Sequence, residues 1–118
     1  MADGYLTTHV LDTAKGQPAA GMRIELFRIN SDSRVLVTEK TTNNDGRTDG
    51  PILPQKVFDL GQFELVFHAG DYLRASGQAT AGLLFLDVIP IRFGMTEQDH
   101  YHVPLLLSPF SYSTYRGS

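Results

Sequence analysis

The amino-acid sequence predicts an all-β domain, folded as a sandwich of two sheets. Short runs rich in Val, Ile, Leu, Thr, Phe and Tyr recur along the chain, and clusters of Gly, Pro, Asn and Asp separate them, as expected for strands joined by turns. Helical periodicity is scarce. About eight short strands in a chain of 118 residues favour a sandwich over a closed barrel. We expect one domain over residues 1–118, because the sequence has no internal repeat or linker.

The first half of the chain contains three clear strand patterns and one weak one. Leu6–Leu11, Met22–Ile29 and Val35–Thr42 are each followed by turn chemistry, in the segments DTAKGQPAAG, NSDS and NNDGRTDGP. The weak run covers Gln55–Phe58. We expect a fourth strand there.

The second half of the chain predicts four more strands. They cover Phe63–His68, Leu83–Phe93, Tyr101–Leu107 and Tyr112–Arg116. The segment AGDYLRASGQ is the one place where a brief helix fits the pattern.

Two prolines fall inside the expected strands. Pro90 lies in LDVIPIR and Pro104 in HVPLLL. Because proline has no N–H to donate to a neighbouring strand, each predicts a sheet edge, a bulge or the end of a strand.

Alternation along the expected strands places the histidines on outward faces. In LTTHVL and YHVPLLL, His9 and His102 lie on the less apolar side of their strands. His68 and His100 are interpreted as solvated side chains, or as side chains satisfied by a neighbour. His100 and His102 share one face, as two metal ligands would, but no third ligand is placed beside them, and we therefore expect no metal site.

The surroundings of two arginines leave their roles open. Arg47, in NNDGRTDGP, is either an exposed loop cation or a guanidinium held on a rigid turn to bind a carbonyl or an anionic heterocycle. Arg116 alternates with tyrosines in the last expected strand. It either protects a sheet edge from aggregation or pairs with the terminal carboxylate.

Composition and charge argue against several classes of function. The chain has no cysteine, which excludes disulfides and cysteine catalysis, and its formal net charge of −3 offers no basic field for nucleic acid or anionic membranes. The start, MADGYLTTHV, lacks a basic segment followed by an apolar stretch. We expect a cytoplasmic protein, or a periplasmic one if a leader has been removed.

Three motifs together resemble the transthyretin-related family. They are LTTHVLDTAKGQPAAGMRIELFRI near the start, NNDGRTDGP in the middle and YHVPLLLSPFSYSTYRGS at the end. The opening strand and SPFSYST are also found in the hormone carrier transthyretin. The residues that distinguish the enzyme branch of the family, the 5-hydroxyisourate hydrolases, are matched by His9, Arg47, His102 and Tyr115-Arg116-Gly117-Ser118.

The resemblance implies a fold, an assembly and a reaction. The fold is an eight-stranded Greek-key β-sandwich with one short helix near Asp71–Ser76, assembled as a homotetramer with its sites at the subunit interface. The reaction is the hydrolytic opening of the six-membered ring of 5-hydroxyisourate to 2-oxo-4-hydroxy-4-carboxy-5-ureidoimidazoline, in urate breakdown to allantoin, without metal or cofactor.

The resemblance also implies roles for single residues. The expected catalytic residues are His9, Arg47, His102 and Ser118, and the expected substrate-binding residues are His9, Arg47, Tyr115, Arg116 and Gly117. A nucleophilic serine is disfavoured because no Gly-x-Ser-x-Gly elbow occurs. The alternatives are a small-molecule carrier of the transthyretin type and a structural sandwich in which the histidines are incidental.

Overall fold

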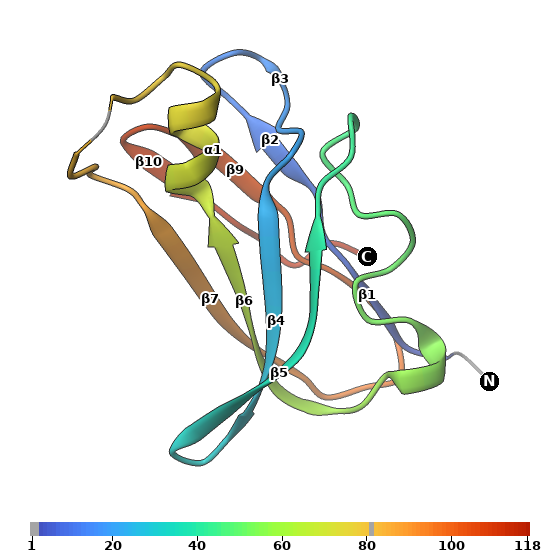
Figure 1. The fold of residues 1–118 in the computed structure, drawn as a ribbon. Helices are drawn as coiled ribbons and strands as arrows, with labels where there is room; N and C mark the ends of the chain where they lie inside the picture. The colour runs from blue at the N-terminus through green and yellow to red at the C-terminus, as the bar shows by residue number, and fades with distance from the viewer. Residues whose placement is uncertain (1–2, 81) are drawn as a thin grey trace.

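The structure, a computed structural model, describes residues 3–80 and 82–118, which form ten strands, one α-helix and one 3₁₀-helix (Figure 1). The strands are β1 (Tyr5–Thr7), β2 (Val10–Asp12), β3 (Gln17–Pro18), β4 (Arg23–Asn30), β5 (Ser33–Thr41), β6 (Gly61–His68), β7 (Val88–Met95), β8 (His100–His102), β9 (Leu105–Ser108) and β10 (Ser111–Ser113). The 3₁₀-helix η1 covers Gln55–Val57 and the helix α1 covers Ala69–Ala75. No helix in the described ranges is long and apolar enough to cross a membrane.

The strands pack as two layers, which confirms the predicted β-sandwich with one short helix (Figure 1). One layer is the antiparallel sheet β5-β4-β6-β7. The other contains the sheet β10-β9-β2-β3 and the strand pair β1-β8. In this second layer β1 runs parallel to β8, and β2 runs parallel to β9. The start of the chain therefore lies beside a segment near its end.

Two expected strands are each divided into two shorter ones. Leu6–Leu11 becomes β1 and β2, interrupted at Thr8 and His9, and the Thr8 hydroxyl donates to the Val103 carbonyl at 2.8 Å. Tyr101–Leu107 becomes β8 and β9, interrupted at Val103 and Pro104. Pro104 cannot donate to a ladder, which accounts for the second interruption.

Other expected boundaries also shift. Gln55–Phe58 was expected to be a strand and instead forms η1, while Phe58 packs against the core. The strand expected from Leu83 begins only at Val88, because the preceding segment lies against α1, where the Gly70 amide donates to the Asp87 carbonyl at 2.9 Å. The strand β3 was not expected.

The core lies between the two layers. On β6 the expected inward residues Phe63, Leu65 and Phe67 are fully buried. Glu64 and Val66 point to the other face, as expected, and they too are buried, at 6% and 4% exposure. Side chains of this sheet cover Glu64, because Arg34 on β5 and Arg92 on β7 both contact its carboxylate.

Candidate active site

His9 lies between β1 and β2, next to the loop that carries Arg47. The backbones of His9 and Arg47 form an isolated antiparallel bridge, and His9 Nε2 lies 2.8 Å from the Asp45 carbonyl oxygen. Because a carbonyl only accepts hydrogen bonds, this contact places a proton on Nε2 of His9 and leaves Nδ1 as the acceptor of the neutral ring. Burial, followed by the Arg47 guanidinium, lowers the pKa of His9.

The turn that carries Arg47 is held by Asn43. The Asn43 side-chain oxygen accepts hydrogen bonds from the backbone amides of Asp45 at 2.9 Å and Arg47 at 3.2 Å. Within this turn Gly46 has a φ of 74° and lies against β2, where a Cβ would be 2.3 Å from the Val10 carbonyl oxygen. Only glycine fits both conditions. The backbone of the turn is therefore fixed, as binding by Arg47 would require, whereas its side chain is exposed, as in an ordinary loop cation.

The Arg47 side chain is exposed and stands near the two histidines without a carboxylate partner. No ion pair of Arg47 is found in the part of the chain that the structure describes. Its positive charge lowers the pKa of both His9 and His102, after the larger effect of burial on each.

His102 is the last residue of β8, and its ring lies next to that of His9 on the second layer. Their ring centroids are 6.5 Å apart. His102 Nδ1 lies 2.8 Å from the hydroxyl of Thr7, which is its register partner on β1. Burial, then Arg47, His100 and His9, lower the pKa of His102. Residues from the start, the middle and the end of the chain thus meet in one place.

The C-terminal segment pairs with the backbone of His102. The Gly117 amide donates to the His102 carbonyl at 2.7 Å, and the His102 amide donates to the Gly117 carbonyl at 3.2 Å. A Cβ on Gly117 would lie 3.1 Å from His102 Cδ2, tighter than an ordinary contact. Ser118 is exposed and directly follows this pair.

Arg116 and Tyr115 lie beside Tyr101 rather than beside the two histidines. Arg116 pairs with Asp99 at 3.0 Å, and its guanidinium lies 4.4 Å from the centroid of the Tyr101 ring. The His100 amide and the Arg116 guanidinium lower the pKa of Asp99. Tyr115 is exposed and lines, with Arg116 and Tyr101, a cleft of about 280 Å³. Arg116 therefore holds the C-terminal segment against the start of β8.

The other two histidines have close neighbours, which is one of the two alternatives left open by the sequence. His68 Nε2 lies 2.6 Å from a Glu25 carboxylate oxygen. His100 stacks on Tyr5 with ring centroids 4.1 Å apart, and its Nε2 lies 2.7 Å from the Thr7 hydroxyl. Nothing in the sequence around Thr7 marks it as a site residue, although it shares a strand face with His9. Within residues 3–80 and 82–118, no cluster of three or more potential metal ligands occurs.

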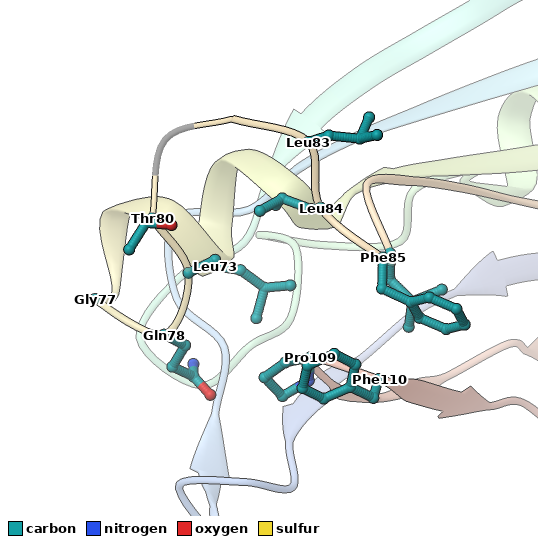
Figure 2. A pocket seen from close by; sticks show the side chains of 11 residues that line it. Leu73, Gly77, Gln78, Thr80, Leu83, Leu84, Phe85, Pro109 and Phe110 are labelled. Carbon is teal, nitrogen blue, oxygen red and sulfur yellow. The ribbon is translucent and has the colours of Figure 1, made fainter.

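An apolar pocket lies away from the histidines, next to α1. Figure 2 shows Phe85 and Phe110 on one side of it, and their ring centroids are 6.0 Å apart. The pocket has a volume of about 340 Å³ and neither His9, Arg47 nor His102 lines it. Its apolar lining includes Leu73, Leu83, Leu84, Phe85, Pro109 and Phe110. Leu83, Phe85 and Phe110 are largely exposed.

Comparison with known sequences identifies close relatives. A model described as HIUase/Transthyretin family matches residues 6–117. The chain is 56% identical over 116 residues to a protein named 5-hydroxyisourate hydrolase 2 from Rhizobium meliloti, covering 98% of this chain and 97% of that protein.

Comparison with solved structures finds the same transthyretin-like sandwich in proteins of different function. (S)-allantoin synthase superposes with a TM-score of 0.90 at 52% identity, over 99% of this chain, which spans only 44% of that chain. Klebsiella pneumoniae 5-hydroxyisourate hydrolase gives 0.77 at 29% identity, covering 98% and 94% of the two chains. Sea bream transthyretin in complex with thyroxine gives 0.82 at 27% identity, covering 95% and 93%.

Proposed function

The chain belongs to the HIUase/Transthyretin family, and on that premise we propose that it is a 5-hydroxyisourate hydrolase. It opens the six-membered ring of 5-hydroxyisourate by attack of water, and the product is 2-oxo-4-hydroxy-4-carboxy-5-ureidoimidazoline. The observation that carries the proposal is the meeting of His9, Arg47 and His102 on the second layer. The names of the nearly full-length relatives support it.

Fold similarity alone does not choose between the enzyme and a carrier. The transthyretin superposes with a TM-score of 0.82 and the hydrolase with 0.77. The choice rests on the site residues, because function is determined by the site rather than by the fold. Two imidazoles beside an unpaired guanidinium fit a polar substrate that undergoes proton transfer better than an apolar hormone.

The two histidines supply the proton transfers. Water attacking a ring carbonyl needs a base, and the departing ring nitrogen needs a proton. The lowered pKa values of His9 and His102 keep both rings neutral near neutral pH. One neutral ring takes the proton of the water, and the imidazolium formed in this way gives that proton, directly or through the other ring, to the leaving nitrogen.

Arg47 stabilises the negative charge that develops on the attacked carbonyl. A preorganised cation acts most strongly where charge forms during the reaction. The Asn43 turn holds the Arg47 backbone, and the guanidinium keeps its donors for the substrate.

The C-terminal residues complete the site. Ser118 follows the backbone pair between Gly117 and His102, so its hydroxyl or its carboxylate can orient a histidine or the attacking water. Gly117 allows the tail to pass close to the His102 ring. Arg116 and Tyr115 contribute to substrate binding by fixing the tail and shaping its surroundings.

We also propose a homotetramer with the sites at subunit interfaces. His9 and His102 are only half-buried in one protomer, and a second subunit over this face excludes water from them. The exposed side chains Leu83, Phe85 and Phe110 around the apolar pocket (Figure 2) support association with another copy.

The test is a time course in which urate oxidase generates 5-hydroxyisourate in the cuvette. The intact protein is compared with a variant that lacks Arg116, Gly117 and Ser118. We expect the intact protein to remove the intermediate well above the spontaneous rate and the folded, equally assembled truncation to lose this effect. If neither protein accelerates the decay while thyroid hormone binds without turnover, the carrier is the correct reading. Equal activity of both proteins would show that residues 116–118 have no role in the reaction.

A further inference from the structure

The hydroxyl of Thr7 lies between the rings of two histidines. Its oxygen is 2.7 Å from Nε2 of His100 and 2.8 Å from Nδ1 of His102. We propose that Thr7 is a positioning residue, which links His100 to His102 and determines which ring nitrogen of His102 carries the proton. The consequence for turnover rests on the proposed hydrolase function, whereas the proton position can be measured without it.

The strand pairing fixes this arrangement. In the parallel pair β1-β8, Tyr5 is the register partner of His100 and Thr7 is the register partner of His102. Tyr5 also stacks on His100, with an angle of 7° between the ring planes. Neither imidazole can turn away without losing a contact, so both nitrogens are kept within reach of one hydroxyl.

A hydroxyl has only one proton to donate, so the two hydrogen bonds depend on each other. When Thr7 donates to His100 Nε2, it accepts from a proton on His102 Nδ1, and His102 Nε2 is then a free base. When His100 carries a proton on Nε2, Thr7 accepts it and can donate to His102 Nδ1, and the His102 proton is then on Nε2. The first arrangement is the one that lets His102 accept a proton from water.

The two site histidines differ in this respect. A carbonyl oxygen fixes the proton of His9 on Nε2, whereas the partner of His102 can donate or accept. The charged and titratable groups that act on His102 are Arg47, His100 and His9. Next to His100 lie Tyr5 and the side chain of Asp99, which accepts from the His100 backbone amide. The adaptable hydroxyl makes His102, and not His9, sensitive to a residue outside the reacting pair.

The decisive measurement is the tautomer of His102, read from long-range ¹⁵N–¹H correlations of the imidazole rings. We expect the wild type to carry the proton on Nδ1. Thr7→Val, which keeps the β-branched shape, should give a mixture of tautomers, and Thr7→Ser should restore the wild-type pattern. A wild type with the proton on Nε2, or an unchanged pattern in Thr7→Val, would overturn the proposal.

A second variant keeps the test valid if Thr7→Val does not fold. His100→Phe retains an aromatic ring against Tyr5 but removes Nε2, so Thr7 is free to donate to His102. We expect its His102 proton to move toward Nε2. An unchanged His102 tautomer in this variant would also contradict the link.

Turnover provides a separate readout. With Thr7→Val we expect kcat to fall about tenfold with little change in KM, as for other residues that orient a reacting group, and Thr7→Ser should recover most of it. Thr13→Val is the matched control, because it removes a hydroxyl that donates to the Leu107 carbonyl away from both rings. An inactive wild type would refute the hydrolase, whereas an active Thr7→Val with an unchanged tautomer would refute only the role of Thr7.

Discussion

The two outer faces of the sandwich both carry arginines and histidines. They differ in whether these side chains have carboxylate partners. On the sheet β5-β4-β6-β7, Glu64 is buried and pairs with Arg34 at 2.8 Å and with Arg92 at 3.1 Å. On the same face His68 pairs with Glu25. The positive side chains of this face have carboxylate neighbours.

On the other layer, the side chains of Arg47, His9 and His102 gather without a carboxylate partner in the described parts of the chain. The histidine rings are held by a carbonyl oxygen and a hydroxyl instead. Burial and the nearby Arg47 cation lower the pKa of both histidines. We call the first the paired face; it carries Glu64, Arg34, Arg92, His68 and Glu25. The second, which carries Arg47, His9 and His102, is the unpaired face, because no ion pair of Arg47 occurs among residues 3–80 and 82–118.

The largest effect should follow from removing one of the two histidines of the unpaired face, which we propose to transfer protons. We expect His102→Asn to lower kcat/KM by about 10²- to 10⁴-fold, the contribution typical of general acid–base catalysis, with an unchanged far-UV spectrum. His68→Asn is the matched control on the paired face and should leave turnover unchanged. The comparison of the two faces fails if both variants lose activity equally.

Removing the free cation should have the next largest effect. Arg47→Gln should lower kcat by about 10²- to 10³-fold, because it deletes the group that we propose to stabilise the developing charge. Arg34→Gln removes an arginine of the other face, and its turnover per folded molecule should match that of the wild type. Steady-state kinetics of both variants will show whether turnover depends on the location of the arginine or only on the total charge of the protein.

Breaking the paired face should change stability rather than turnover. Glu64→Gln leaves Arg34 and Arg92 without their carboxylate, but both arginines are about half exposed and regain water. We therefore expect a loss of only about 1 to 2 kcal/mol in urea unfolding at fixed protein concentration. Glu39→Gln, which breaks an exposed pair with Arg23, should cost less. A large loss of turnover in Glu64→Gln would contradict the separation of the faces.

The smallest effect should be a change in the pKa values of His9 and His102 when the Arg47 charge is removed. Burial and then Arg47 lower the pKa of His9 and His102, so Arg47→Gln should raise both pKa values part of the way toward the ordinary value of about 6.5. Because the neutral rings act, the acid limb of activity should move to higher pH in the variant. NMR titration of the two imidazole rings in the wild type and in the variant should show these shifts.

The same lowered pKa values make a prediction for stability. Between the folded pKa values and about 6.5, the unfolded chain binds more protons than the folded one, so stability should fall as pH falls through this window. The loss should stop once the pH is below the folded pKa values. Arg47→Gln should narrow this pH range, because it raises the folded pKa values toward about 6.5. Urea unfolding at several pH values can measure the change.

The sequence predicted the features that depend on local periodicity, namely the direction of the histidine side chains and the break in one strand. Alternation in LTTHVL and YHVPLLL placed His9 and His102 on the outward face, because side-chain direction in a strand depends only on neighbouring residues. The break at Pro104 was visible for the same reason. The weak run at Gln55–Phe58 was too short to distinguish a strand from a turn, and the prediction there was wrong.

Contacts between distant strands could not be predicted from the pattern. The pairing of Glu64 with Arg34 and Arg92 depends on the register of β5, β6 and β7, which no local signal encodes. No local pattern points to Thr7, because its contacts with His100 and His102 depend on the register of β1 with β8. The roles assigned to the site residues came from the resemblance, and they stay predictions until turnover is measured.

The parallel pairing of β1 with β8 has a consequence for folding. The hydrogen bond between Thr7 and His102 joins positions 95 residues apart in the sequence. Closing so long a loop costs chain entropy before any contact repays it, and sandwiches dominated by such pairings fold in milliseconds to seconds, far more slowly than helical bundles. During refolding, the local hairpin of β4 and β5 can form early. His9, His100 and His102 come together only after β1 has paired with β8. Recovery of turnover should therefore be among the last events of refolding.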